Sequence, residues 1–385
     1  MLVKALTGSK KYWVWVIFLL VLVAIGLACY LWQLQKGLTI TGMSRDVSWG
    51  LYIGQFTFLV GVAASAVMVV LPYYLHNVKA FGRITILGEF LAVAALIMCL
   101  LFIIVDLGKP MRLLNMIFYP TPNSILFWDM IVLNGYLLLN IIAGWHALEA
   151  EYKAVPPPAW TKILVYISIP WAVSIHTVTA FLYAGLPGRH YWLTAIMAAR
   201  FLASAFASGP ALLILLSYII KRVSKFDPGR EAIQKLAAIV TYATIISVFF
   251  VGLEIFTAFY SQVPAHGMSS IIYLFAGLDG HGKLVPWMWT FAILAVLALV
   301  LLINPATRTR DTYLQAACAA VFISMWIEKG IGLVIGGFIP NPFERVTEYV
   351  PTLPETLIAL GVWATGFLIL TFLYKIAIAV KEETV

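Results

Sequence analysis

The chain has 385 residues, of which 62% are hydrophobic and only 11% are charged. A soluble domain of this size carries about 25% charged residues, so most of the surface of this chain is expected to face lipid. The net charge of +8 comes from basic residues in short connections between apolar runs, where they set topology and contact lipid headgroups. No soluble basic face is left to bind nucleic acid.

Ten apolar runs are long enough to cross a membrane, which takes about 20 residues as a helix. The first run is too long for the apolar part of a signal peptide and lacks a clear cleavage site, so we expect it to be retained. The predicted fold class is therefore an all-α integral membrane protein of about ten transmembrane helices. Their expected ranges are 12–35, 47–75, 84–105, 125–147, 162–186, 196–220, 236–262, 285–303, 313–339 and 356–378.

Lysine and arginine are distributed unequally over the connections. A cytoplasmic N-terminus puts 16 of the 25 basic residues on the cytoplasmic side, many of them in the loop 221–235. We expect a multi-pass protein of the cytoplasmic membrane with both termini in the cytoplasm. The longer outer connections are then 33–50, 106–124, 263–284 and 340–355. They could form a platform for an extracytoplasmic partner, or act only as interfacial anchors rich in Trp and Tyr.

Spans two to five resemble spans six to nine in their polarity pattern. His176 lies 11 residues before Pro187, as Lys329 lies 11 before Pro340, and an acid occurs within both the third and the seventh span. Such a repeat would be parallel, about an axis along the membrane normal. Chance similarity among apolar helices is the alternative.

Redox ligands are scarce in this sequence. Cys29, Cys99 and Cys318 are far apart, each within an apolar run, with no spacing typical of a zinc or iron–sulfur site. A bis-histidine haem needs two imidazoles at matched depth, and His176 is the only histidine well inside a span. A pair of His76 and His146 at the cytoplasmic ends is the remaining arrangement. We expect no metal, no haem and no iron–sulfur cluster in this chain.

Several ionisable residues lie inside predicted spans. Each is costly in lipid, so each suggests either a function or an ion pair that fixes helix packing. Glu328 and Lys329 are sequence neighbours about 100° apart on a helix, so they need partners on other spans. The set comprises Glu89, Asp129, His176, Arg200, Glu254, Glu328 and Lys329, and Asp106 closes the third span on the outside.

The stretch IIVDLGKPMRLLN at 103–115 resembles the signature of the NrfD/polysulfide-reductase membrane-subunit superfamily, an Asp-Leu-Gly-Lys-Pro-x-Arg turn directly after a span. Supporting matches are SWGLYIG at 48–54, FWDM at 127–130, SIHTVTAF at 174–181 and LPGRHYW at 186–192. The resemblance covers essentially the whole chain. Ten spans look like the branch of HybB, HmcC and DsrP, and the sequence is most similar to DsrP.

The resemblance implies a subunit without redox cofactors of its own. It would exchange electrons between menaquinone and a periplasmic ferredoxin-like iron–sulfur subunit, within a respiratory complex that also holds other membrane and cytochrome subunits. The expected organisation is an N-terminal helix and outer loop (1–46), a first four-helix bundle with the quinone site (47–188), a second four-helix bundle (189–345) and a C-terminal helix (346–385).

Asp129 and His176 match the acid and the histidine that the family has in its fourth and fifth spans, although many relatives have Glu where Asp129 stands. Quinone carbonyls need hydrogen-bond donors, and quinone chemistry moves two protons, so we expect these residues to be the catalytic pair. Asp106 and Arg112 are expected to shape the mouth of the site, with a further hydroxyl from Tyr183. A proton path is expected through Glu89, Glu254, Glu328 and Lys329.

Two other functional classes stay open. A secondary transporter would also suit an internal repeat and buried charges, but no pair of spans has the matched Gly/Pro breaks typical of discontinuous helices. A purely structural membrane anchor of the complex is the third possibility.

Overall fold

The structure is a computed structural model that describes residues 2–262 and 267–384. The described chain is built of helices, and its only β-pairing is an isolated bridge between Leu278 and His281. Ten of its helical segments are long and apolar enough to cross a membrane. Helices are the expected form, because a backbone in hydrocarbon must pair its polar groups within the segment. The predicted all-α membrane fold is confirmed.

Eight spans each contain one long helix, and two are divided. The single helices are α1 (Lys10–Lys36), α4 (Thr85–Asp106), α6 (Ile125–Tyr152), α7 (Ala159–Ala184), α8 (Met197–Val223), α9 (Arg230–Ser261), α11 (Val285–Ile303) and α15 (Leu353–Thr384). The second span consists of α2 (Leu51–Ala63) and α3 (Ser65–Tyr74), and the ninth of α13 (Asp311–Met325), the π-helix η7 (Trp326–Leu333) and α14 (Val334–Gly336). The predicted spans are all found, with ends shifted by a few residues.

Short helices occur in the connections. They are η1 (Leu2–Leu6), η2 (Gly37–Ile40), η3 (Lys79–Arg83), η4 (Pro110–Leu114), α5 (Asn115–Phe118), η5 (His190–Trp192), α10 (Met268–Phe275) and α12 (Pro305–Arg308). Within the predicted outer connection 263–284, residues 263–266 lie outside the described residues.

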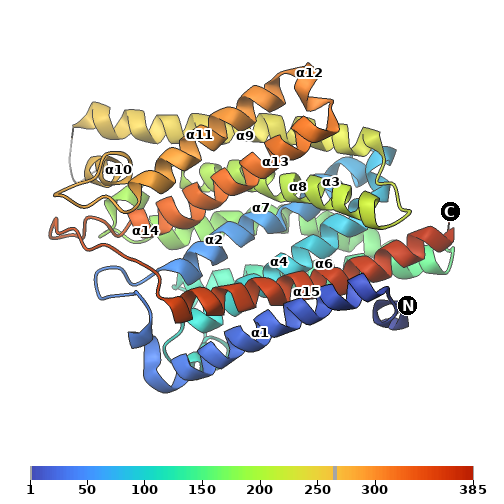
Figure 1. The fold of residues 1–385 in the computed structure, drawn as a ribbon, viewed down its shortest axis with the longest axis horizontal. Helices are drawn as coiled ribbons and strands as arrows, with labels where there is room; N and C mark the ends of the chain where they lie inside the picture. Colours follow the sequence, from blue (N-terminus) through green and yellow to red (C-terminus); the bar gives the residue numbers. More distant parts are fainter. Residues whose placement is uncertain (1, 263–266, 385) are drawn as a thin grey trace.

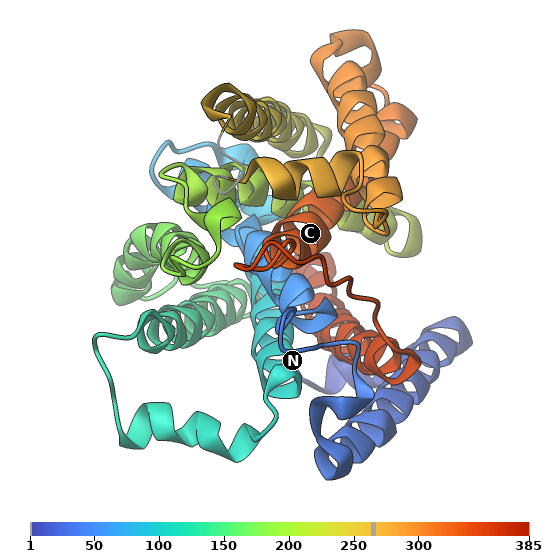
Figure 2. The ribbon, with the colours of Figure 1, turned by 90° about the vertical axis from the view of Figure 1, so that its left-hand side faces the viewer.

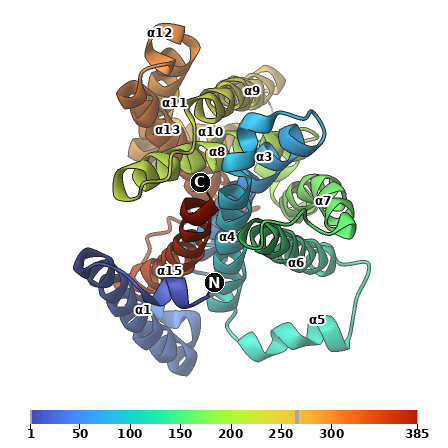
Figure 3. The same cartoon turned by 90° about the vertical axis from the view of Figure 1, so that its right-hand side faces the viewer.

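Both termini lie at one end of the helix bundle, together with α12, whereas α10 lies at the other end (Figure 1). We call these the terminus end and the α10 end. The segment with η4 and α5 belongs to the α10 end and stands away from the other helices (Figures 2 and 3). The common end of the two termini agrees with an even number of spans.

The core is formed by spans two, three, six and nine, which are much more buried than the others. The second span packs on α4, on α8 and on η7, so it joins the two halves of the chain. The first and last long helices, α1 and α15, lie side by side at the edge (Figure 1), and α15 also packs on α4. The division into two four-helix bundles remains a prediction.

The sequence predicts that no pair of equivalent spans has matched Gly/Pro breaks, and the two divided spans can be compared with this prediction. The second span is interrupted at Ala64 and the ninth by η7. In the predicted repeat the second span corresponds to the sixth and the ninth to the fifth, so the two interruptions do not match one another. The interruptions exist, but not in the paired arrangement typical of transporters with discontinuous helices.

Of the two residue pairs that the predicted repeat makes equivalent, one lies at the same depth in the structure and the other does not. His176 lies eight residues before the end of α7, and Lys329 lies seven before the end of its span, both toward the α10 end. Glu89 lies near the start of α4, at the terminus end, whereas Glu254 lies near the end of α9, at the α10 end. The two acids therefore occupy opposite depths, and they are not equivalent by a parallel repeat.

Two glycines allow the second and ninth spans to touch through their backbones. A Cβ atom on Gly54 would overlap the carbonyl of Gly330, and one on Gly330 would lie 3.0 Å from the Gly54 oxygen. Small residues permit such close approach in membranes, where packing rather than hydrophobicity holds helices together.

Gly54→Val should lower the free energy of unfolding by about 1–3 kcal/mol, because overpacking forces α2 and η7 apart. Unfolding by denaturant titration in lipid micelles measures this change. Gly252→Val is the matched control, since nothing lies within 4 Å of a Cβ atom there. Equal stability of the two variants would mean that the Gly54–Gly330 contact contributes nothing.

Candidate functional site

Three side chains on one face of α7 point into the core near the α10 end. His176, Thr179 and Tyr183 follow at i, i+3 and i+7, a spacing that aligns them along one side of a helix. His176 and Thr179 are 0% exposed and Tyr183 is 1% exposed. Polar groups this deep in a membrane protein need partners from neighbouring helices.

Hydrogen bonds join this face of α7 to α6 and α2. The Thr179 hydroxyl donates to Oδ1 of Asp129, at 2.8 Å, and Asp129 is 3% exposed. The Tyr183 hydroxyl is hydrogen-bonded to the hydroxyl of Thr57. The structure thus brings Asp129, His176 and Tyr183 into one buried cluster, although the hydrogen-bond partner of Asp129 is Thr179 and not His176.

His176 has one occupied and one unoccupied ring nitrogen. Nδ1 lies 2.6 Å from the carbonyl oxygen of Ala172, one turn back in the same helix. A carbonyl only accepts, which assigns the proton of a neutral ring to Nδ1 and leaves the Nε2 lone pair free. Nε2 is buried and has no partner at good hydrogen-bond geometry among the described residues. A weaker hydrogen-bonding contact joins the ring to the Val60 backbone, and the Lys329 ammonium acts on the ring electrostatically.

An aromatic cluster covers Tyr183 toward the α10 end. Its ring packs edge-on against Trp49 and Trp192, with ring centroids 5.6 and 5.1 Å apart. The indole N–H of Trp192 donates to the carbonyl of Leu333, in η7, at 2.8 Å. The cluster ties the end of α7 to both the second and the ninth span.

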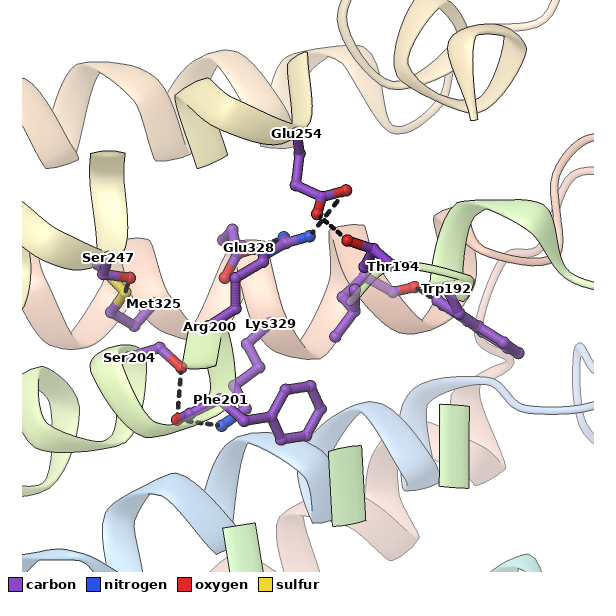
Figure 4. A network of polar contacts seen from close by, with 11 residues as sticks. Trp192, Thr194, Arg200, Phe201, Ser204, Ser247, Glu254, Met325, Glu328 and Lys329 are labelled. Carbon is purple, nitrogen blue, oxygen red and sulfur yellow. Dashed lines mark hydrogen bonds and ion pairs between the residues drawn. The ribbon is translucent and has the colours of Figure 1, made fainter. Parts of the chain in front are cut away.

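A second polar network centres on Arg200 and links α8, α9 and η7 (Figure 4). Nη2 of Arg200 donates to Oε1 of Glu328 at 2.5 Å, and Nη1 lies 3.7 Å from Oε2 of Glu254. The other carboxylate oxygen of Glu254 accepts from the Thr194 hydroxyl at 2.7 Å. Arg200 is only 6% exposed, so the two carboxylates neutralise a charge that would otherwise be very costly there.

Lys329 leaves the other side of η7 and points toward the first half of the chain. Its ammonium donates to the Phe201 carbonyl at 3.4 Å and lies 4.1 Å from the centroid of the Phe201 ring (Figure 4). A Cβ atom on Gly61, in α2, would lie 3.4 Å from the same ammonium. Lys329 therefore lies between the Arg200 network and the His176 cluster.

Asp106 and Arg112 form no hydrogen bond with either cluster, although Asp106 is near enough to Tyr183 to interact with it electrostatically. Asp106 ends α4, near Tyr52 and Glu355, and its buried Oδ1 has no hydrogen-bond partner in the described part of the chain. Arg112 is exposed on η4, in the segment that stands away from the helices (Figure 2). The structure does not bring these two residues together with Asp129 and His176.

Glu89 lies apart from both clusters, near the terminus end of α4. It is 3% exposed, and its Oε2 has no hydrogen-bond partner among the residues described. A Cβ atom on Gly144 of α6 would lie 3.2 Å from that oxygen. The small residue at position 144 leaves room for this carboxylate between α4 and α6.

Sequence reasoning missed the threonine hydroxyl groups and the two acidic partners of Arg200. Thr179 could have been found, because it follows His176 by three residues on the same helix face. Thr57 and Thr194 carry no such local signal, since their partners lie on other helices. Arg200 was noted as an intramembrane charge, but its two acidic partners are 54 and 128 residues away in the sequence.

The amino-acid sequence of this chain is similar to those of several known membrane subunits. The chain is 22% identical to the Hdr-like menaquinol oxidoreductase integral membrane subunit of Archaeoglobus fulgidus, over 98% of this chain and 96% of that protein. It is 21% identical to the menaquinone reductase integral membrane subunit of Nitratidesulfovibrio vulgaris, over 95% and 91%. It is also 24% identical to a selenate reductase subunit of Mesobacillus selenatarsenatis, over 88% and 87%.

The family model described as "Polysulphide reductase, NrfD" matches residues 39–339. This range contains both polar clusters and most of the chain. The protein is a polytopic membrane protein that belongs to the NrfD family of polysulphide reductase membrane subunits.

Proposed function

We propose that this chain is the quinone-interacting membrane subunit of a respiratory complex, with menaquinone as its exchangeable substrate. The observation that carries the proposal is the buried cluster of Asp129, Thr179 and His176, in which Nε2 of His176 is an orphaned acceptor. Two relatives are named for menaquinol or menaquinone, which supports the same substrate class.

The residues of this cluster fit a quinone headgroup. A bound quinone supplies an exchange of two electrons and two protons, while the chain has to bind the headgroup and hold or move protons. His176 offers an unoccupied nitrogen that can accept a hydrogen bond, or donate one after protonation. Asp129 can hold a proton, and the Thr179 hydroxyl fixes the orientation of its carboxylate. Because all three are buried, binding also requires displacement of neighbouring side chains.

Tyr183 would supply a further hydroxyl, which is shared with Thr57. For Asp106 and Arg112 we retain the proposal that they shape the mouth of the site, on the family resemblance alone. In this proposal the quinone site lies in a first bundle (47–188), and the Arg200 network lies in a second bundle (189–345).

We further propose that electrons pass between the quinone and an extracytoplasmic ferredoxin-like iron–sulfur subunit bound at the α10 end. This end has the long connections and lies nearer the His176 cluster. Other membrane and cytochrome subunits would complete the complex, and this chain would itself hold no haem or iron–sulfur cluster. A DsrP-like role in sulfur metabolism follows from the sequence resemblance.

We propose that different residues carry protons at the α10 end and at the terminus end of the bundle. Lys329, Glu328 and Glu254 form a series from the first half of the chain to the α10 end, with Arg200 between the two acids. Glu89 is the candidate group on the terminus side. A secondary transporter is the alternative function; the buried charges support it, whereas the unpaired interruptions of spans two and nine do not.

Asp129→Asn and His176→Ala should each abolish quinone-linked electron transfer without loss of complex assembly. Thr179→Val should reduce it about ten- to hundredfold, because a hydrogen bond to a charged group contributes about 1.5–3 kcal/mol. Quinol oxidation by the purified complex measures the effect, and gel filtration reports assembly.

Thr177→Val is the matched control, because Thr177 is only half-buried and its hydroxyl bonds to the Val173 carbonyl of its own helix. Full activity in the Asp129 and His176 variants would refute the site. Loss of assembly in both would favour a purely structural role.

The orientation can be tested with reporter fusions. A reporter that is active only in the cytoplasm should work at the C-terminus, and one that is active only outside should work when inserted after Phe275 at the end of α10. The reverse pattern would put the α10 end in the cytoplasm and remove the proposed docking site for the iron–sulfur subunit.

Glu254→Gln should slow proton-coupled turnover about tenfold or more while leaving quinone binding at His176 unchanged, because the amide cannot carry the proton. Proton release into the medium by reconstituted vesicles, recorded with a pH dye, measures this step. Glu231→Gln provides a control acid, since Glu231 is an exposed residue at the other end of α9. Equal proton release by both variants would exclude Glu254 from the path.

A further inference from the structure

A cavity of about 410 Å³ lies at the α10 end, in the second half of the chain. Its walls come from the end of α9, the segment between η5 and α8, and α10. Its volume is within the range of roughly 300–1,000 Å³ that ligand pockets have. None of Asp129, His176 and Tyr183 is among its lining residues, so it is distinct from the site proposed above.

The α9 wall of the cavity is amphipathic. Leu253, Glu254, Thr257 and Ala258 line it and fall on one side of the helix, since they are spaced by one, four and five residues. Ile271 of α10 adds an apolar surface opposite. A molecule with an apolar body and a polar head would therefore find both surfaces that it needs.

The polar groups of the cavity converge on Glu254. Thr194 lines the cavity and donates to Oε1 of Glu254, whereas Oε2 receives no hydrogen bond within the described chain. Behind it, Nη1 of Arg200 forms an ion pair with Oε2 at 3.7 Å, and the guanidinium also interacts with the Tyr191 hydroxyl. The Glu254 end of this ion pair thus lies at the wall of the cavity.

Tyr191 adds a neutral hydroxyl to the same lining. Burial raises the pKa of Tyr191 to about 12; the nearby Arg200 opposes this shift, and Glu328 and Glu254 add to it, so the hydroxyl keeps its proton at physiological pH. The cavity can therefore both donate to and accept from an oxygen-bearing headgroup.

The charge near the cavity favours some amphiphilic ligands over others. Arg200 lies between two carboxylates, Glu254 and Glu328, so these three side chains together carry a net charge of −1, and Glu254 is the one that lines the cavity. A phosphate headgroup would be repelled, whereas a neutral headgroup with oxygen donors and acceptors would not. From this geometry we propose that the cavity binds the headgroup of an isoprenoid quinone or quinol, as a second quinone site in the second half of the chain.

This proposal takes only its ligand class from the proposed function and uses neither Asp129 nor His176. The test is photolabelling of the intact complex in membranes with a menaquinone analogue that carries an azido group on the ring. Peptide mass spectrometry should find one adduct on α6 or α7 and a second on the α9 segment Leu253–Ser261.

Thr257→Phe should reduce the α9 adduct at least tenfold, because the larger ring narrows the cavity, and should leave the α6 or α7 adduct unchanged. Gly252→Phe is the control on the same helix, since no atom lies within 4 Å of a Cβ atom at this position. Glu254→Gln should also weaken the α9 adduct, because the amide keeps only one acceptor oxygen and loses the negative charge; gel filtration of this variant reports whether the complex is intact.

Three results would overturn the proposal. The first is labelling of α6 or α7 without labelling of α9, and the second is equal labelling of α9 in the Thr257→Phe and Gly252→Phe variants. The third is a phospholipid that native mass spectrometry finds bound to the unsubstituted protein but not to Thr257→Phe, together with no quinone adduct on α9. Labelling of α9 without α6 or α7 would instead support this site and contradict the one at His176.

Discussion

The burial of Arg200 between two carboxylates is the interaction on which the arrangement of the second half depends. A guanidinium stays charged in any protein environment, so its place inside a membrane bundle requires anionic partners. Glu254 and Glu328 provide them from α9 and from η7. Removal of one partner of such a buried pair typically costs about 3–5 kcal/mol, which makes the three helices one unit.

The same pairing determines where Lys329 points. Glu328 faces Arg200, and its neighbour Lys329 therefore leaves η7 on another side, toward Phe201 and Gly61. The π-helix widens the turn at this position, a feature that is frequent at functional sites. Close contact of Gly54 with Gly330 holds η7 against α2, and the ammonium lies near the His176 ring. The two polar clusters are thus neighbours across the junction of the two halves.

The sequence was sufficient to predict the spans, because a run of about 20 apolar residues has one common outcome in a membrane. It also identified the buried ionisable residues, since each is conspicuous in an apolar run. It could not predict their partners. A span that is apolar on all sides has no periodicity that shows which face meets which helix, so Thr57 and Thr194 had no signal.

Three further features could not be predicted from the sequence, for physical reasons. The π-helix Trp326–Leu333 carries Glu328 and Lys329 to partners on other spans, and a local sequence pattern does not contain such contacts. The prediction that Glu89 and Glu254 are equivalent in the repeat was wrong, because the presence of an acid in a span does not say at which depth in the membrane it lies. Arg112 was grouped with Asp106 on their shared turn, yet η4 carries it into the segment that stands away from the bundle (Figure 3).

The central claim is that His176 contacts the quinone through its free Nε2. Solid-state ¹⁵N NMR of the complex in lipid, with labelled histidine and with His176→Gln to assign the resonance, measures that nitrogen directly. Addition of a saturating menaquinone analogue should shift the Nε2 resonance of His176 and leave Nδ1, which is bonded to Ala172, nearly unchanged. An Nε2 resonance that does not move while the analogue is bound would contradict the account.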